Sequence, residues 1–191
     1  MKGRQSGMPE KGYWGTFFDP ACVLAKLGCE GSTGDVVEFG CGYGTFTEPA
    51  ARAIAGTVYA LDIDPAMVAA TRCRVGDAGL TNVLVEERDF VADGCGRPDG
   101  SVAYVLLFNI LHIEDPVALL REAYRALRPD GTAGILHWNH DPATPRGPSL
   151  DIRPRPGQCR AWAEQAGFEF VRDEPLTCCA HHYGLVVRRP I

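Results

Sequence analysis

The stretch that decides the fold is VVEFGCGYGTFTEPA, which runs from Val36 to Ala50. Its first residues are apolar except for Glu38 and are typical of a buried strand, and its last residues are typical of a helix start. Between them stand Gly40, Gly42 and Gly44. Because glycine allows a sharp turn and a close approach of the backbone to a ligand, this unit predicts a nucleotide-like ligand.

Strand and helix patterns alternate along the rest of the chain. Near-continuous apolar or alternating runs predict strands at residues 35–40, 57–63, 82–90, 102–108, 132–138, 168–176 and 183–189. Helical spacing, with Asp-Pro at several starts, predicts helices at residues 17–28, 45–56, 64–79, 115–131 and 157–167. Gly56 is expected to close the second of these helices.

This alternation predicts an α/β fold with a Rossmann-like, doubly wound, seven-stranded sheet. The sheet is expected to be mostly parallel, and the last two strands are expected to form an antiparallel pair at its C-terminal edge. Right-handed crossovers place the carboxyl ends of the parallel strands along one edge, where ligands bind in such folds. The residues that follow each strand are therefore the candidates for function.

Size and charge narrow the function classes. A chain of 191 residues with 46% hydrophobic and 23% charged residues predicts a single globular domain. Its net charge of −5 argues against a broad nucleic-acid-binding surface. The longest apolar run, residues 102–108, is too short to cross a bilayer, and the N-terminus has no apolar signal core. We therefore expect a cytoplasmic protein without a membrane partner.

The eight cysteines do not have the density of a disulfide scaffold. Cysteines in unrelated contexts are expected to be reduced thiols: Cys22, Cys41, Cys73 and Cys95. The one concentration is CCAHH, with Cys178 and Cys179. Adjacent strand residues point to opposite faces, so a hairpin turn with incidental thiols is favoured over a metal site.

The glycine spacing separates two cofactor classes. A dinucleotide fold prefers G-x-G-x-x-G, whereas Thr45 stands where its third glycine would fall. Glu38, two residues before Gly40, would be unhelpful beside a pyrophosphate but suits a cationic amino acid. A nicotinamide-dependent oxidoreductase is therefore disfavoured.

VVEFGCGYGTFT resembles the glycine-rich motif of class I S-adenosylmethionine-dependent methyltransferases. The resemblance continues in order through VYALDIDPAMV, VEERDF, DGSVAYVLLFNILHIEDPVALLREAYRALRPDG and GILHWN, over about residues 35–139. Within that group the chain is similar to small-molecule methyltransferase domains of the ubiquinone-biosynthesis kind. The resemblance implies a methyltransferase domain at 35–191 and an N-terminal lid or helix segment at 1–34, within one domain overall.

Carried over by position, the resemblance implies a site for S-adenosyl-L-methionine. Gly40, Gly42 and Gly44 would line its methionine and ribose part, and Glu38 would support that loop or approach the amino group. Asp62 would accept hydrogen bonds from both ribose hydroxyls. The remaining implied contacts are Ile63 on the adenine, Asp89 accepting from the adenine amino group with Phe90 beside it, and Asn109 near the transferred methyl. Asp64 is expected to be a helix cap rather than a site residue.

Methyl transfer is an in-line displacement that positioning alone can promote, so a base is optional. His112 and His140 are the candidate bases because they follow the fourth and fifth strands, and His137 is a further candidate. The N-terminal stretch is expected to lie over the cofactor pocket as a lid or to cover the sheet. Its large apolar residues are Met8, Tyr13, Trp14, Phe17 and Phe18.

The acceptor is expected to be a small molecule. FNIL at residues 108–111 lacks the signature of amino-group DNA methylation, and little chain is left for recognising a macromolecule. A stretch rich in arginine is either solvated or an anion site, so the acceptor could be anionic. Its arginines are Arg146, Arg153, Arg155 and Arg160. Two alternatives stay open: a non-catalytic S-adenosylmethionine-binding module, and a thiol or metalloid methyltransferase that uses Cys178 and Cys179.

Overall fold

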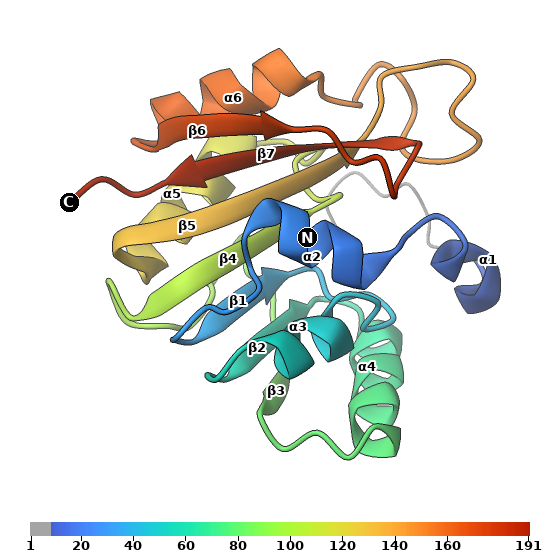
Figure 1. The fold of residues 1–191 in the computed structure, drawn as a ribbon, viewed down its shortest axis with the longest axis vertical. Coiled ribbons are helices and arrows are strands. Elements are labelled where there is room, and N and C mark those ends of the chain that lie inside the picture. The colour runs from blue at the N-terminus through green and yellow to red at the C-terminus, as the bar shows by residue number, and fades with distance from the viewer. Residues whose placement is uncertain (1–8) are drawn as a thin grey trace.

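The computed structural model describes residues 9–191, and these form a three-layer α/β fold (Figure 1). One seven-stranded sheet has the order β3-β2-β1-β4-β5-β7-β6. The strands are β1 (Val36–Phe39), β2 (Val58–Asp62), β3 (Val83–Glu87), β4 (Val102–Phe108), β5 (Leu127–Trp138), β6 (Glu169–Glu174) and β7 (His182–Arg188). The helices are α1 (Lys11–Gly15), α2 (Pro20–Leu27), α3 (Thr47–Ala53), α4 (Pro65–Asp77), α5 (Pro116–Ala126) and α6 (Pro156–Gln165).

The pairing of the strands confirms the predicted doubly wound sheet. β1 pairs in parallel with β2 and β4, β2 with β3, and β4 with β5. β7 is antiparallel to both β5 and β6, so the predicted antiparallel C-terminal pair is present. The order of the chain reverses between β1 and β4, which puts the topological switch point at the carboxyl ends of these two strands.

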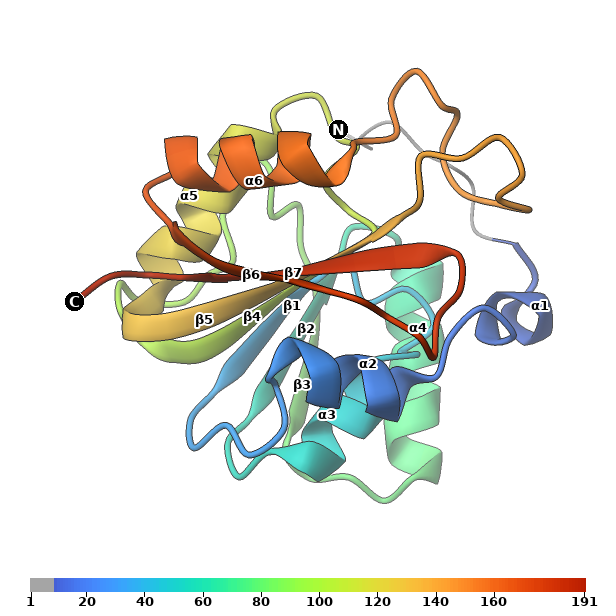
Figure 2. The ribbon, with the colours of Figure 1, turned by 45° about the horizontal axis from the view of Figure 1, so that its top comes forward.

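The helices cover both faces of the sheet (Figure 2). In that view α5 and α6 lie on one side of the sheet and α2 and α3 on the other. Each face has its own apolar cluster, one built around Leu107, Leu120 and Ile135 and the other around Leu24, Phe46 and Leu136. All seven residues of β4 are buried because helices cover it on both sides.

Asp-Pro pairs begin three of the helices, as their sequence predicts. Asp19, Asp64 and Asp115 each accept a hydrogen bond from a backbone N–H in the first turn of the following helix. By contrast, Gly56 does not close α3, which ends at Ala53. Gly56 is required for a different reason: a Cβ there would lie 2.4 Å from the carbonyl oxygen of Gly34.

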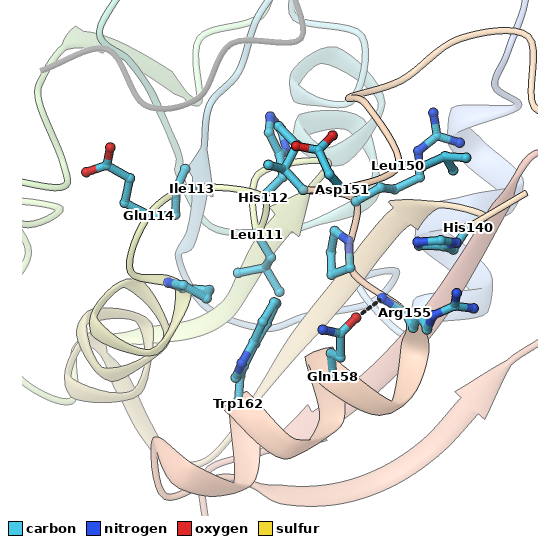
Figure 3. Close-up of a pocket in the computed structure, with 14 residues that line it drawn as sticks. Leu111, His112, Ile113, Glu114, His140, Leu150, Asp151, Arg155, Gln158 and Trp162 are labelled. Carbon is cyan, nitrogen blue, oxygen red and sulfur yellow. Dashed lines mark hydrogen bonds between the residues drawn. The ribbon is translucent and has the colours of Figure 1, made fainter. Parts of the chain in front are cut away.

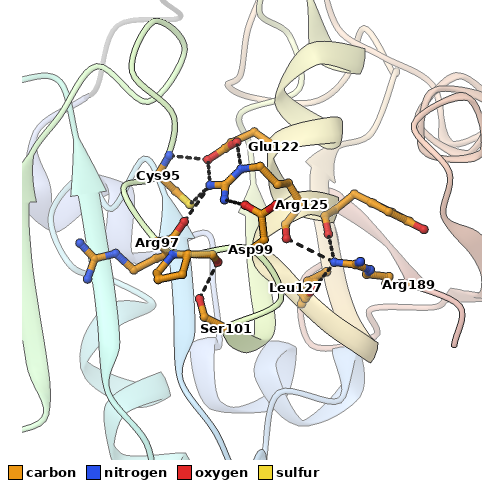
Figure 4. Close-up of polar contacts among 10 residues, drawn as sticks. Cys95, Arg97, Asp99, Ser101, Glu122, Arg125, Leu127 and Arg189 are labelled. Carbon is orange, nitrogen blue, oxygen red and sulfur yellow. Dashed lines mark hydrogen bonds and ion pairs between the residues drawn. The ribbon is translucent and has the colours of Figure 1, made fainter.

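Hydrogen bonds of Arg125 link the connection between β3 and β4 to the C-terminal end of α5 (Figure 4). Its guanidinium donates to Glu122 and Asp99 and to the carbonyl oxygen of Arg97. The backbone N–H of Cys95 donates to the same Glu122 carboxylate. These hydrogen bonds lower the pKa of Glu122 to about 2, although burial acts in the opposite direction. The carboxylate therefore stays charged and holds this connection at neutral pH.

The cysteine prediction is wrong at two positions. Cys22 in α2 forms a disulfide with Cys178 in the connection between β6 and β7. The sequence gives little sign of this bond because 156 residues separate the two cysteines and only the packing of α2 beside β7 brings them together. Cys41, Cys73 and Cys95 are free, as expected.

Within residues 9–191 no helix combines the length and the apolar character that a membrane span requires.

Candidate functional site

The glycine loop adopts a left-handed backbone at all three glycines. The φ angles are +79° at Gly40, +54° at Gly42 and +71° at Gly44, a region that residues with a Cβ rarely enter. A Cβ at Gly44 would also lie 3.2 Å from the Thr71 side chain of α4. The Thr71 hydroxyl donates to the carbonyl oxygen of Gly42 at 2.7 Å and fixes the loop from outside. The loop is therefore a turn whose backbone conformation favours glycine and which Thr71 holds in place.

Asp62 ends β2 and is tied to this loop. Its Oδ2 accepts from the backbone N–H of Gly42 at 2.8 Å, and its Oδ1 accepts from that of Asp64 at 3.0 Å. Burial raises the pKa of Asp62, and the two N–H groups act in the opposite direction. A carboxylate with four lone-pair positions keeps acceptor capacity beyond these two bonds.

Glu38 lies beneath the loop rather than on its open side. The residue is 2% exposed, and its Oε2 accepts from the Thr47 hydroxyl of α3 at 2.5 Å. Burial raises the pKa of Glu38 to about 8, so the side chain is largely a neutral acid at pH 7. In this structure Glu38 supports the strand-to-helix turn from within.

Asn109 follows β4 at the switch point. Its φ is +54°, and its backbone N–H donates to the carbonyl oxygen of Leu136 at 2.7 Å. Its Oδ1 is buried and has no hydrogen-bond partner among the described residues. A buried acceptor without a donor is costly, so this atom is suited to a ligand that brings a donor group.

The three remaining residues predicted to contact the adenine differ in their surroundings and exposure. Ile63 is partly exposed directly after Asp62. Asp89 follows β3, and its Oδ1 accepts from the backbone N–H groups of Val91 and Ala92. Phe90 is buried in the core, with its ring 5.3 Å from that of Phe39. Phe90 therefore packs beneath this edge of the sheet.

A pocket of about 450 Å³ opens beside the switch point (Figure 3). Its walls come from the connection after β4, the loop between β5 and α6, and the first two turns of α6. Its lining includes His112, Glu114, His140, Asp151, Arg155 and Trp162. This volume is within the range of small-molecule sites. In Figure 3 Glu114 and Arg155 lie at opposite ends of the pocket, so its charge is uneven.

The pocket brings together both predicted bases. His112 is 8% exposed, and its Nδ1 lies 3.3 Å from Nε2 of His137, which is fully buried. His140 is partly exposed on the same lining. Sequence reasoning missed Gln158 and Trp162. Their spacing of four along α6 puts them on one helix face, and this spacing is the signal that could have found them.

The arginine-rich loop is held by one of its own arginines. Arg153 is 7% exposed, and its guanidinium donates to the carbonyl oxygens of Asn139, Arg146 and Pro148. The prediction of a solvated loop is therefore wrong for Arg153. Arg155 is exposed and lines the pocket.

The N-terminal aromatic residues cover the end of β5. Trp14, Phe17 and Phe18 pack edge-on against Trp138, with ring centroids 5.1–6.2 Å apart. The Tyr43 hydroxyl, within the glycine loop, donates to the carbonyl oxygen of Pro9. This segment thus contacts both the sheet and the loop. Met8, which the lid prediction included, lies outside the described residues.

The disulfide argues against a thiol or metalloid methyltransferase that uses Cys178 and Cys179. Cys178 is bonded to Cys22 and is not a free thiol. Cys179 is 2% exposed, and burial raises the pKa of its thiol to about 12. Neither cysteine offers the accessible thiolate that this alternative needs.

Comparison with known proteins identifies the family of the chain. Residues 36–131 match the family described as methyltransferase domain. A ubiquinone biosynthesis O-methyltransferase of Xanthomonas oryzae pv. oryzae is 33% identical over 124 residues, which cover 63% of this chain and 49% of that protein. One of Pseudomonas paraeruginosa is 29% identical over 185 residues, which cover 84% of this chain and 75% of that protein. The chain spans about half the length of the first of these curated relatives.

Among solved structures, a SAM-dependent methyltransferase from Aquifex aeolicus superposes with a TM-score of 0.79 at 23% identity. The match covers 91% of this chain and 90% of the other. At this identity the likeness shows the shared fold.

Proposed function

The chain belongs to the methyltransferase-domain family of class I S-adenosylmethionine-dependent methyltransferases, and from this premise we propose that it methylates a small, anionic hydroxyl compound. The observation that carries the cofactor part of the proposal is Oδ1 of Asn109, which is buried and has no hydrogen-bond partner among residues 9–191. Asn109 follows β4, the parallel neighbour of the strand that leads into the left-handed glycine loop. The family uses S-adenosylmethionine, whose methionine end brings an ammonium group as donor.

The residues present fit this cofactor. Gly40, Gly42 and Gly44 would leave room for its methionine and ribose part, and Asp62 would use its remaining lone pairs for the ribose hydroxyls. Asn109 would accept from the methionine end. Ile63 and Asp89 would contact the adenine, with Phe90 supporting them from the core. Glu38 would hold the loop through Thr47.

When bound, S-adenosylmethionine would supply a methyl group carried on a sulfonium sulfur. The sulfur would keep the electron pair of the broken S–C bond and leave as a neutral thioether. The chain's own task is to hold an acceptor oxygen in line with that methyl group and to remove the hydroxyl proton. His112 lines the pocket beside the switch point and is the proposed base, with His140 as the second candidate.

Charge around the pocket supports an anionic acceptor. Arg155 lines one end, and Arg153 is a buried cation whose hydrogen bonds go to carbonyl oxygens rather than to a carboxylate among the described residues. These two side chains contribute two cations to the lining. The carboxylates of Glu114 and Asp151 also line the pocket, with Glu114 at the end opposite Arg155 (Figure 3). The name of the relatives, ubiquinone biosynthesis O-methyltransferase, supports oxygen as the acceptor atom.

Calorimetric titration with S-adenosylhomocysteine tests the cofactor site. We expect Asp62→Ala to weaken binding about ten- to hundredfold, because hydrogen bonds to a charged group contribute about 1.5–3 kcal/mol. Asp64→Ser, two residues further along the chain, keeps the helix cap of α4 and should leave the affinity unchanged. Equal affinity of Asp62→Ala and the parent protein would contradict this assignment.

Release of S-adenosylhomocysteine from a panel of hydroxylated carboxylic acids and their methyl esters tests the acceptor. We expect turnover of an acid, and Arg155→Gln should raise its KM about tenfold with little effect on the ester. Arg160→Gln is the control, since Arg160 lies on the exposed face of α6 and pairs with Glu164. Cofactor binding without turnover of any acceptor would instead favour the non-catalytic module.

A further inference from the structure

His112 and His137 meet because β4 and β5 are parallel neighbours. Phe108 pairs with Leu136, so His137 is the next residue of β5, and His112 follows four residues after β4. Their rings are edge-to-face at 80°, with Nδ1 of His112 pointing to Nε2 of His137 at 3.3 Å. His112 lines the pocket, and His137 lies fully buried behind it.

The surroundings of His137 keep it neutral. Burial, followed by the nearby His112 and His182, holds the pKa of His137 well below its usual range, and the Arg153 cation acts in the same direction. The Tyr183 ring stacks against it, with a centroid distance of 6.3 Å. Its Nδ1 has no hydrogen-bond partner among the described residues. The titratable groups that line the pocket around His112 are Glu114, His140, Asp151, Arg153 and Arg155.

Two neutral imidazoles joined in this way share one hydrogen. If His112 carries it on Nδ1, His137 accepts through Nε2, and Nε2 of His112 is the nitrogen that carries no hydrogen. If His137 carries it, His112 presents only an N–H at its other nitrogen. A protonated His112 has N–H groups at both nitrogens, so only the first arrangement preserves the contact when His112 takes up a proton.

We propose that His137 is a positioning residue, which holds the hydrogen of His112 on Nδ1 and leaves Nε2 of His112 as the base for the acceptor hydroxyl. The inference rests on the proposed function. In the step it serves, the O–H bond of the acceptor breaks and its electron pair stays on oxygen for the new bond to the methyl carbon. The proton forms an N–H bond at Nε2 of His112, and the cation is stabilised by the Nδ1–H donated to His137.

Nitrogen-15 NMR of the histidine rings tests the proposal directly. In the protein without cofactor, we expect His112 to carry its hydrogen on Nδ1. His137→Leu should shift His112 towards the Nε2-protonated form that predominates in free histidine. His137→Gln, whose side-chain amide offers an acceptor near the position of Nε2, should retain the Nδ1-protonated form. His182→Gln is the control, because Nδ1 of His182 contacts Cys179 rather than His112.

Steady-state kinetics of the same variants provide a second test of the role of His137. We expect His137→Leu to lower kcat about ten- to hundredfold with little change in KM, and His137→Gln to recover most of it, since general-base catalysis contributes about 10²–10⁴-fold. Unchanged S-adenosylhomocysteine affinity and thermal unfolding would show that each variant is folded.

An Nε2-protonated His112 in the parent protein, or a His112 tautomer unaffected by His137→Leu, would overturn the inference. The NMR measurement needs neither cofactor nor acceptor, so it decides the role of His137 separately. Failure of the proposed function would instead appear as absent S-adenosylhomocysteine binding or absent turnover in the parent protein.

Discussion

Glu38 is a carboxylic acid in the interior, and its titration is linked to folding. Its pKa is about 8 in the folded chain, against 4.5 for an ordinary glutamate, because burial disfavours the carboxylate. Between these values the folded chain holds a proton that the unfolded chain has lost. The free energy of unfolding should therefore fall as pH rises through this window, by up to about 1.4 kcal/mol per pH unit.

Glu38→Gln should remove this dependence, because an amide of the same shape does not titrate. Urea unfolding of both proteins between pH 5 and pH 8 measures it, and the difference in stability should grow in favour of the variant as pH rises. Parallel curves over this range would mean that Glu38 is ionised in the folded protein. Thr47→Val is the control variant: it removes the hydroxyl that donates to Glu38 but keeps the titrating carboxyl group, so the pH dependence should remain.

At the scale of single residues, the chemical role of a side chain can be predicted from the sequence more reliably than its burial. The three glycines and Asp62 could be placed because left-handed turns and strand ends impose recognisable residue types. Arg153 could not, since a guanidinium in a polar, proline-rich segment looks solvated until the loop folds over it. The partner of His112 could not be identified either, because their contact depends on the register of β4 and β5.

The loop between β5 and α6 forms part of the wall of the pocket that we propose for the acceptor, and Arg153 holds this loop. Lysine carries the same charge but lacks the planar set of donors, so Arg153→Lys cannot satisfy several carbonyl oxygens at once. We expect it to lower stability by about 1–3 kcal/mol, to speed amide hydrogen exchange within residues 141–152, and to raise KM for the acceptor. Exchange mass spectrometry localises the change.

Arg160→Ala, on the exposed face of α6, should leave exchange in the same loop unaltered. Equal protection of residues 141–152 in Arg153→Lys and the parent protein would show that Arg153 does not hold the loop.

For elements, hydrophobic periodicity together with Asp-Pro starts predicted the strands and the helices from α2 to α6. Helix ends were less certain, as α3 shows, because Gly56 is required by the nearby backbone of Gly34 and not by the helix. α1 was not predicted. Its five residues carry no apolar stripe, and none of them is buried, so the hydrophobic pattern gives no signal there.

For the whole molecule, the predicted compartment and the observed disulfide disagree. The N-terminus without an apolar signal core, the short apolar runs and the scattered cysteines favoured a cytoplasmic protein, which stays a prediction. The Cys22–Cys178 disulfide is a bond that persists in oxidising compartments and is rare in the cytosol. It joins α2, at the start of the fold, to the connection before the last strand, and so closes most of the chain into one loop.

Closing so long a loop restricts the unfolded chain, so the bond should stabilise the fold by about 2–5 kcal/mol. We expect reduction, or Cys22→Ser with Cys178→Ser, to lower Tm by on the order of 10 °C. Cys73→Ser is the matched control, because Cys73 is an exposed free thiol. Thiol titration provides an independent count: six thiols should react in denatured, unreduced protein, and eight after reduction. Eight reactive thiols before reduction, with an unchanged Tm in the double variant, would show that the two ends of the fold are held by packing alone.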